Sequence, residues 1–180
     1  STLVPRFSWW TANVWRSECT DAPRMPASLR YFPTRSSIDR GPIQALVLSH
    51  AHDIKSGIID TTAESFDRHI AVNARASLLL IAAFARQVSD TGGAIVAFTS
   101  DHTTGNLPYG ASKGALDRIV ISAARELGPR RISANVVNPG PIDTGWMDDT
   151  TRDGIAPHHP LARLGTPRDI AAITAFLLSD

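Results

Sequence analysis

The sequence predicts an α/β protein in which helices cover both faces of a parallel β-sheet. Three short apolar runs, residues 44–49, 94–99 and 132–137, have the length and composition of buried strands. Segments with apolar residues at helical spacing alternate with these runs. Strands that are apolar throughout are typical of parallel sheets, because helices bury them from either side. We therefore expect one α/β domain over residues 1–180, with an orderly core at 43–180.

Size and composition agree with one globular domain. The chain has 180 residues, 43% of them hydrophobic and 19% charged, which is long enough to bury a core. A net charge of +1 gives no basic field for nucleic acid or anionic membranes. The longest apolar run, Leu78–Ala85, is too short to span a bilayer. The single Cys19 excludes an internal disulfide and favours a reducing, cytoplasmic location.

Residues 1–42 differ from the remainder because they show no sustained period. They hold most of the tryptophans among scattered prolines and arginines, and only Phe7–Thr11 and Leu29–Phe32 have the pattern of strands. We expect this segment to be irregular, or a partial N-terminal unit of the domain.

A long helix is predicted between the first two strands. Thr61 and Glu64 have capping-box spacing, and Gly92-Gly93 ends the segment. Asn73 is the one amide in its buried stripe, and a buried amide needs hydrogen-bond partners. Either Asn73 lies at the edge of a broad stripe, or it bonds backbone or water and extends a proton relay towards Lys113. The whole stripe is Phe66, Ile70, Asn73, Ser77, Leu80 and Phe84.

Two further helices follow. The first starts near Pro108 and its expected buried residues are Leu116, Ile119, Val120, Ala123 and Leu127. The second is capped by Thr166 and carries Pro167 at its first position. Its expected apolar face is Ile170, Ile173, Phe176 and Leu177.

The most informative residues are Tyr109 and Lys113, which open a helix, and Ser100, which ends the strand before it. Residues four apart lie on the same helix face. A phenol has a pKa of about 10, and a neighbouring cation favours the phenolate and lowers that pKa. A nearby serine hydroxyl can hold a carbonyl or alcohol oxygen. Each residue alone is a weak signal, but with Asn73 in this chain order they predict a proton-transfer site for carbonyl–alcohol chemistry.

Two loops should share the carboxyl edge of the sheet with this site, where ligands of open α/β sheets bind. Asn138–Thr144 follows the third strand, and its prolines and glycine predict either a rigid binding shelf or a plain turn. Ser49, His50, Ala51 and His52 follow the first strand. The two histidines suggest a metal, but no carboxylate or cysteine lies at ligand spacing, so we expect no metal site.

Gly110–Gly114 also matches the G-x-S-x-G elbow of serine hydrolases, with Ser112 as the nucleophile. That motif requires a strand directly before it, whereas residues 105–108 have loop composition. A hydrolase is therefore a minor alternative.

Taken together, these residues resemble the short-chain dehydrogenase/reductase family. The resemblance implies a doubly wound, three-layer Rossmann-like sheet that binds NAD or NADP. It implies that Tyr109 is the general acid/base and that Ser100 positions the substrate oxygen. Lys113 would lower the tyrosine pKa and hold the nicotinamide ribose, and Asn73 would support the relay. The matching segments are Ala71–Asn73, Phe98–Ser100, Tyr109–Ala115, Asn135–Gly140 and Leu164–Ile170.

The same resemblance implies further features. Ser49–His52 stands where the family usually has Asn-Asn-Ala-Gly and would contact the cofactor. Pro139, Gly140, Pro141, Ile142 and Thr144 would line the nicotinamide and the phosphates, and Asp143–His159 would form the substrate lid. A homodimer or homotetramer would assemble through the helices that carry Asn73 and Tyr109. The substrate would be a small carbonyl or alcohol compound, whose identity stays open, as does the choice of NAD or NADP.

Three departures from the family pattern also bear on function. No glycine-rich turn precedes Gly41, Ser100 and Tyr109 are only nine positions apart, and the chain ends at Asp180 where the family adds a strand. The fold is thus expected to lack its N-terminal βα unit and its C-terminal strand. The alternative function is a catalytically silent binding or scaffolding protein without a cofactor loop.

Overall fold

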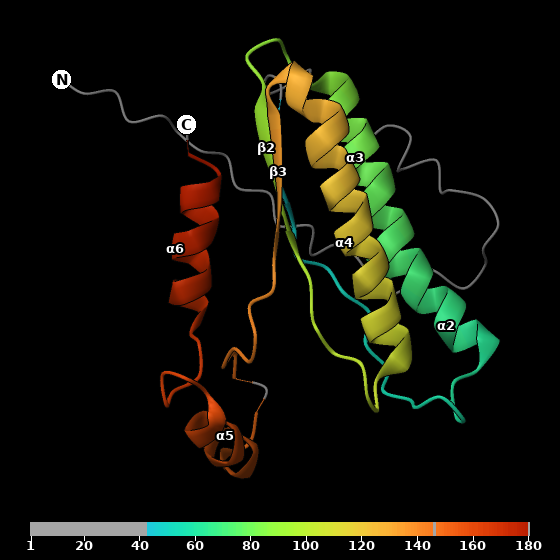
Figure 1. The fold of residues 1–180 in the computed structure, drawn as a ribbon, viewed down its shortest axis with the longest axis vertical. Helices are drawn as coiled ribbons and strands as arrows, with labels where there is room; N and C mark the ends of the chain where they lie inside the picture. The colour runs from blue at the N-terminus through green and yellow to red at the C-terminus, as the bar shows by residue number, and fades with distance from the viewer. Residues whose placement is uncertain (1–42, 146, 180) are drawn as a thin grey trace.

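The computed structural model describes residues 43–145 and 147–179 (Figure 1). The strand candidates Phe7–Thr11 and Leu29–Phe32 lie outside these residues. Helices and strands alternate along the chain. Their order is β1 (Ala45–Leu48), α2 (Ala63–His69), the π-helix η1 (Ile70–Arg75), α3 (Ala76–Gln87), β2 (Gly93–Phe98), α4 (Leu107–Leu127), the 3₁₀-helix η2 (Gly128–Arg130), β3 (Ile132–Val137), α5 (Asp149–Ile155), the 3₁₀-helix η3 (Ala156–His158) and α6 (Pro167–Leu177).

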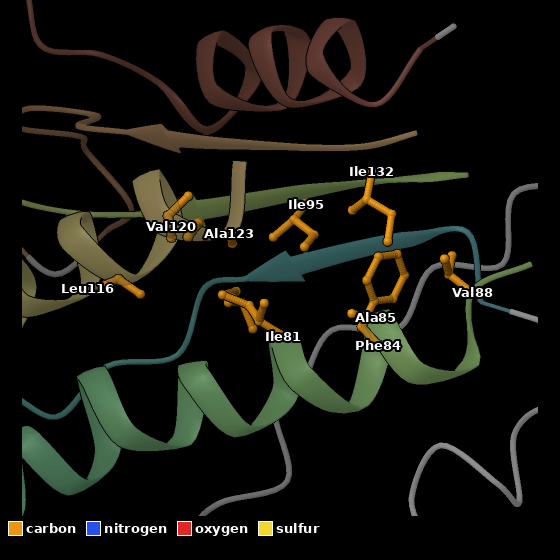
Figure 2. Close-up of a cluster of buried hydrophobic side chains, with 11 residues drawn as sticks. Ile81, Phe84, Ala85, Val88, Ile95, Leu116, Val120, Ala123 and Ile132 are labelled. Carbon is orange, nitrogen blue, oxygen red and sulfur yellow. The ribbon is translucent and has the colours of Figure 1, made fainter. Parts of the chain in front are cut away.

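The described strands form one parallel sheet in the order β1-β2-β3. Ala45 pairs with Ala94, and Gly93 pairs with Ile132, so the strands run side by side in the same direction. Helices α3 and α4 pack on one face of the sheet and α6 lies on the other (Figures 1 and 2). The predicted α/β fold with a parallel sheet between two helical layers is confirmed.

The core lies between the sheet and the α3/α4 layer, and Figure 2 shows its side chains. Ile95 and Ile132 on the strands meet Phe84 on α3, and each is at most 4% exposed. Burying each large apolar side chain stabilises the fold by roughly 1.5–3 kcal/mol. The buried cluster is Leu48, Ile81, Phe84, Ala85, Val88, Ile95, Ala97, Leu116, Val120, Ala123 and Ile132.

The helix that carries Asn73 departs from its predicted form in two ways. Its cap is Thr62, whose hydroxyl accepts a hydrogen bond from the Ser65 N–H at 3.1 Å, while Thr61 bonds Gly57 instead. The predicted Thr61–Glu64 capping box is therefore wrong, because the helix is capped one residue later by the Thr62 hydroxyl alone.

The second departure is the π-helix η1, which widens the helix at Ile70–Arg75. A wider turn changes which residues face the core. The predicted stripe is correct at Asn73, Ser77 and Phe84, but Phe66, Ile70 and Leu80 are only half-buried. The buried positions that a single helical period missed are His69, Ala74, Ile81 and Ala85.

The other two long helices, α4 and α6, can be compared with their predicted buried residues. In α4, Leu116, Val120 and Ala123 are buried as predicted, and Ile119 and Leu127 pack partly against the core. In α6 the cap is confirmed, since Thr166 and Asp169 form a capping box. The helix carries the four predicted apolar residues: within the described structure Ile170 and Leu177 are half-buried, whereas Ile173 and Phe176 are 39% and 71% exposed.

One continuous helical segment of the described chain, residues 63–87, has the length and apolar character that a membrane span needs. Ile81, Phe84 and Ala85 of this segment are buried in the core. Packing in the core therefore accounts for part of its apolar surface, while Leu78 is 47% exposed.

Candidate functional site

Three connections leave the strands at the same edge of the sheet, because parallel strands end together. Residues 49–62 follow β1, residues 99–106 follow β2, and residues 138–148 follow β3. The Thr99 N–H donates to the Val137 carbonyl at 2.9 Å and joins the last two. The predicted site residues Ser49–His52, Ser100 and Pro139–Thr144 consequently share this edge.

Tyr109 and Lys113 lie together at the start of α4. The Lys113 Nζ is 5.7 Å from the centroid of the Tyr109 ring and donates a 2.7 Å hydrogen bond to the Phe98 carbonyl. Lys113 is 3% exposed, whereas Tyr109 is only half-buried. Burial lowers the pKa of Lys113 to about 8. The lysine therefore approaches the phenol from the interior, and the phenol keeps a side that solvent can reach.

The pKa of Tyr109 differs from the sequence-based expectation. Burial raises it above its ordinary value, and the negative charge of Asp53 raises it further. The expected lowering by Lys113 does not occur in this arrangement. Two features explain this: the Lys113 ammonium is bonded to Phe98 and not to the phenol, and its own lowered pKa reduces its charge.

Ser100 is connected to Tyr109 through His102. The Ser100 Oγ accepts a 3.2 Å hydrogen bond from the His102 backbone N–H. An accepted bond leaves the hydroxyl hydrogen of Ser100 free to donate to a substrate oxygen. The His102 ring meets the Tyr109 ring edge-on, with centroids 6.5 Å apart and planes at 80°.

Asn73 is fully buried, and its amide is saturated with hydrogen bonds. Its Oδ1 accepts from the His52 N–H at 2.7 Å, and its Nδ2 donates to the His52 carbonyl at 2.9 Å and to the Ser112 Oγ at 2.8 Å. The reading of Asn73 as a partner of backbone groups is confirmed. Its amide makes no direct hydrogen bond to Lys113 within the described residues, and its part in a proton relay towards that lysine stays a prediction.

Ser112 completes a chain of contacts from the loop after β1 to α4. Its Oγ accepts from Asn73 and donates to the Tyr109 carbonyl at 2.7 Å. The side chain is fully buried inside α4. A serine that is buried and whose hydroxyl is already donated cannot act as a nucleophile on an incoming ester. The hydrolase alternative is therefore wrong.

The loop after β1 lies against α2 and η1 through its histidines. The His50 Nε2 is 3.1 Å from the Val72 carbonyl, so this nitrogen carries the proton and Nδ1 is an acceptor. Within the described residues that buried Nδ1 has no hydrogen-bond partner. Burial lowers the pKa of His50, which keeps the ring neutral.

The His52 ring lies beside the His69 ring, with centroids 4.5 Å apart and planes tilted by 58°. Both nitrogens of His69 are used by Ile54 and Ser65. Across residues 43–145 and 147–179, no group of three or more metal-ligating side chains gathers. Ser49 and Ala51 are exposed at the same edge.

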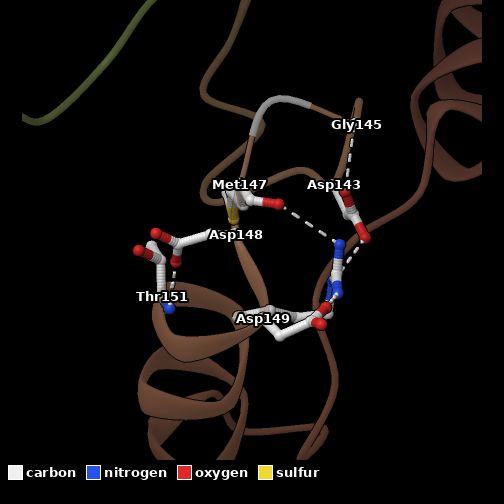
Figure 3. A network of polar contacts seen from close by, with 7 residues as sticks. Asp143, Gly145, Met147, Asp148, Asp149 and Thr151 are labelled. Atoms are coloured by element: carbon white, nitrogen blue, oxygen red, sulfur yellow. Dashed lines mark hydrogen bonds and ion pairs between the residues drawn. The ribbon is translucent and has the colours of Figure 1, made fainter.

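The loop Pro139–Thr144 is fixed by contacts to the segment before α6. Ile142 forms a bridge with Gly165, and Gly140 has a positive φ of 63°. Asp143 is paired with Arg152 at 2.9 Å, and Arg152 also bonds Asp149 and the Met147 carbonyl (Figure 3). Within the described residues, this loop makes no hydrogen bond to Tyr109 or Lys113. It leaves the sheet at the carboxyl end of β3, the edge at which the connection from β2 to α4 also begins.

Sequence reasoning missed Asn106 and Asp53, whose contact holds the start of α4. Asn106 is 2% exposed, and its Nδ2 donates to Asp53 at 2.8 Å. The Leu107 N–H donates to the Ser56 carbonyl at 3.0 Å. An asparagine before Pro108 marks a helix start, but no local pattern reveals a partner so far away in the sequence.

Comparison with known proteins shows which family this chain resembles. A family model described as enoyl-(acyl carrier protein) reductase matches residues 34–180. The uncharacterized oxidoreductase YjdA of Bacillus subtilis is 40% identical over 142 residues, which cover 75% of this chain and 57% of the relative. Carbonyl reductase [NADPH] 2 of Sus scrofa is 34% identical over 151 residues, 78% of this chain and 62% of the relative. The chain thus spans about half to three fifths of these relatives.

Solved structures agree with this picture. The angucycline C-6 ketoreductase LanV with bound NADP has a TM-score of 0.75 at 28% identity, over 84% of this chain and 62% of that one. Acetoin dehydrogenase YohF from Salmonella typhimurium has a TM-score of 0.75 at 29% identity, over 87% and 65%. A further relative, 36% identical over 133 residues (68% of this chain and 48% of the relative), is dehydrogenase/reductase SDR family member 4 of Sus scrofa. From the matched residues, the shared fold and the ordered site, the chain belongs to the short-chain dehydrogenase/reductase family.

Proposed function

We propose that the protein is an NAD(P)-dependent oxidoreductase that interconverts a carbonyl and an alcohol. The observation that carries this proposal is the arrangement of Tyr109, Lys113 and Ser100: a half-buried phenol, a buried amine over its ring and a hydroxyl with a free hydrogen, at one sheet edge. The relatives named carbonyl reductase and ketoreductase support it.

The residues at this edge fit a nicotinamide dinucleotide. Lys113 donates one hydrogen bond to Phe98 and has further N–H groups for a ribose hydroxyl. His50 offers a buried acceptor at Nδ1. The cofactor would lie between two loops, Ser49–His52 after β1 and Pro139–Thr144 after β3. The proposed cofactor is NAD or NADP, and the NADP in the ketoreductase LanV supports the latter.

The chain's own residues would handle the substrate oxygen and its proton. The Ser100 hydroxyl donates a hydrogen bond to the carbonyl oxygen and fixes its position. The Tyr109 phenol gives its proton to that oxygen during reduction and takes it back during oxidation. The bound cofactor supplies or accepts the hydride. The raised pKa of Tyr109 keeps the phenol protonated near neutral pH, so the proton is in place for reduction.

Replacement of Tyr109 by phenylalanine tests the proposal. We expect Tyr109→Phe to lower kcat/KM for carbonyl reduction by about 10²-fold or more, since the general acid is removed while the ring is kept. The assay follows NADPH and NADH oxidation with a panel of small ketones and aldehydes. Tyr31→Phe, at the other tyrosine of the chain, is the control and keeps the parent rate. A Tyr109→Phe protein as active as the parent would reject the proposal.

Cofactor binding separates this function from a catalytically silent relative. Titration of the protein with NADPH and NADH, followed by tryptophan fluorescence, gives saturable binding of at least one of them if the protein is an enzyme. If neither binds, the silent alternative is favoured.

The proposed assembly is a homodimer or homotetramer through the helices that carry Asn73 and Tyr109. Leu78 on α3 and Ile121 on α4 support it, because these apolar side chains are 47% and 38% exposed. Light scattering on the parent and on a Leu78→Glu/Ile121→Glu variant would test it. A dimer or tetramer that becomes monomeric supports the proposal, and a monomeric parent overturns it.

A further inference from the structure

His102 lies between two of the proposed catalytic residues and is anchored to both. Its backbone N–H donates to the Ser100 Oγ at 3.2 Å. Its carbonyl oxygen lies so close to Gly110 that a Cβ at that glycine would be 1.9 Å away. The nine-position spacing from Ser100 to Tyr109 leaves a short connection, and these contacts fix it against the first turn of α4.

The His102 ring is on the solvent side of the phenol. Lys113 meets the Tyr109 ring from the interior and is 3% exposed, whereas His102 is exposed and meets the ring edge-on at 6.5 Å. A substrate enters from solvent, so it reaches Tyr109 from the side on which His102 stands. Within residues 43–145 and 147–179, no hydrogen bond occupies the ring nitrogens of His102. An imidazole offers one donor and one acceptor when neutral, and two donors when charged.

We propose that His102 is a substrate-recognition residue that donates a hydrogen bond to a second oxygen of the substrate, close to the reacting carbonyl. The inference rests on the proposed reductase function. The substrate class that it names is dicarbonyl and hydroxycarbonyl compounds. Ser100 and Tyr109 hold the reacting oxygen, and His102 holds the second one. Plain ketones and aldehydes lack the partner for its imidazole.

The test compares kcat/KM for 2,3-butanedione and for 2-butanone in the parent, His102→Phe and His102→Gln, with the intact protein and NADPH. The readout is kcat/KM for 2,3-butanedione divided by kcat/KM for 2-butanone. Comparing this ratio between the parent and the variants cancels the greater intrinsic reactivity of a diketone. Phenylalanine keeps an aromatic ring beside Tyr109 and removes the donor. We expect His102→Phe to lower the ratio about 3- to 10-fold, the size of one hydrogen bond. His102→Gln keeps a donor and retains most of the ratio.

Thr104→Ala is the matched control, since Thr104 is exposed in the same connection. It should leave the ratio unchanged. An unchanged ratio in His102→Phe, or equal losses with both ketones, overturns the role of His102. Tyr109→Phe must lower both rates; if it does not, the reductase function itself fails, and that outcome is distinct from a failure at His102.

Discussion

Burial and a nearby negative charge both act on the phenol of Tyr109. Burial raises its pKa, and the carboxylate of Asp53 raises it further. Lys113 is over the ring at 5.7 Å from the inside. Asp53 is held by the buried Asn106. In the proposed reaction, a raised pKa keeps the phenol protonated near neutral pH, which is the state that reduction of a carbonyl needs.

Removing the charge of Asp53 should shift the titration of Tyr109. In a Tyr31→Phe background Tyr109 is the sole tyrosine of the chain, so near-ultraviolet tyrosinate absorbance reports its pKa directly. We expect a pKa above the ordinary value and a lower one after Asp53→Asn, because the phenolate loses a negative neighbour. Asp53 is exposed, so the difference should shrink as salt is added. Asp60→Asn, in the same loop, serves as the control, and equal shifts in both variants would contradict the role of Asp53.

Ser112 should act on catalysis through the position of Tyr109. Ser112→Ala leaves the Asn73 amide short of one acceptor and the Tyr109 carbonyl short of one donor, inside the protein. We expect a loss of about 1–3 kcal/mol in the free energy of unfolding and a lower kcat with little change in KM. Denaturant unfolding and steady-state kinetics measure the two effects. Ser122→Ala is the control on the same helix, since Ser122 is exposed. A variant with parent stability and parent kcat would rule out this role.

Two glycines of α4 show how the helix and the preceding connection are joined. At Gly110 an added Cβ would collide with the His102 carbonyl at 1.9 Å, whereas at Gly114 nothing lies within 4 Å. The first glycine permits the close approach of the connection that carries Ser100 and His102. The second has no such neighbour in the described residues.

The pair gives a matched prediction. Gly110→Ala should displace the connection, lower thermal stability and lower kcat/KM, because a backbone carbonyl cannot move aside cheaply. Gly114→Ala should raise stability by roughly 0.5–1 kcal/mol, since alanine is the better helix former. Thermal unfolding and kinetics on both variants provide the check. The opposite order of stability would show that His102 is not packed as described.

At the scale of elements, sequence reasoning located the strands to within one residue because each is a continuous apolar run. It located α4 because Pro108 and the stripe through Leu116 and Val120 agree. It failed at the stripe around Asn73 because one helical period was assumed across η1. It located α6 and its cap, but an apolar stripe alone does not say which of its residues are covered. For the site, it predicted Tyr109, Lys113 and Ser100 from local spacing, and their catalytic roles stay a proposal. It missed Asp53 and Asn106, whose contact joins distant segments.

At the scale of the whole molecule, the buried lysine couples stability to pH. In the folded protein the pKa of Lys113 is about 8, well below the ordinary 10.5. Between these values the unfolded chain holds the proton and the folded one has released it, so stability rises with pH. Above about pH 10 the raised pKa of Tyr109 makes stability fall as pH rises, because the folded protein keeps the phenol proton that the unfolded chain has lost. The expected location in the cytoplasm stays a prediction.

We expect the free energy of unfolding to increase from pH 8 to pH 10 in the parent and to change less in Lys113→Met. Denaturant titrations at a series of pH values measure the slope. Lys55→Met, at an exposed lysine, is the control and should follow the parent. If stability changed equally with pH in the parent and in Lys113→Met, the pKa of Lys113 would not be lowered by burial in the folded protein.

The widened turn at Ile70–Arg75 affects how this chain tolerates the insertion or deletion of a residue. A π-helical turn accommodates more residues than the regular helix around it. Losing one residue there would convert the wide turn into a regular one, and the helix on either side would keep its faces. Asn73 lies inside the wide turn, so its own position relative to Ser112 would change. A deletion of one position would thus act on the Asn73 contacts and leave the neighbouring turns as they are.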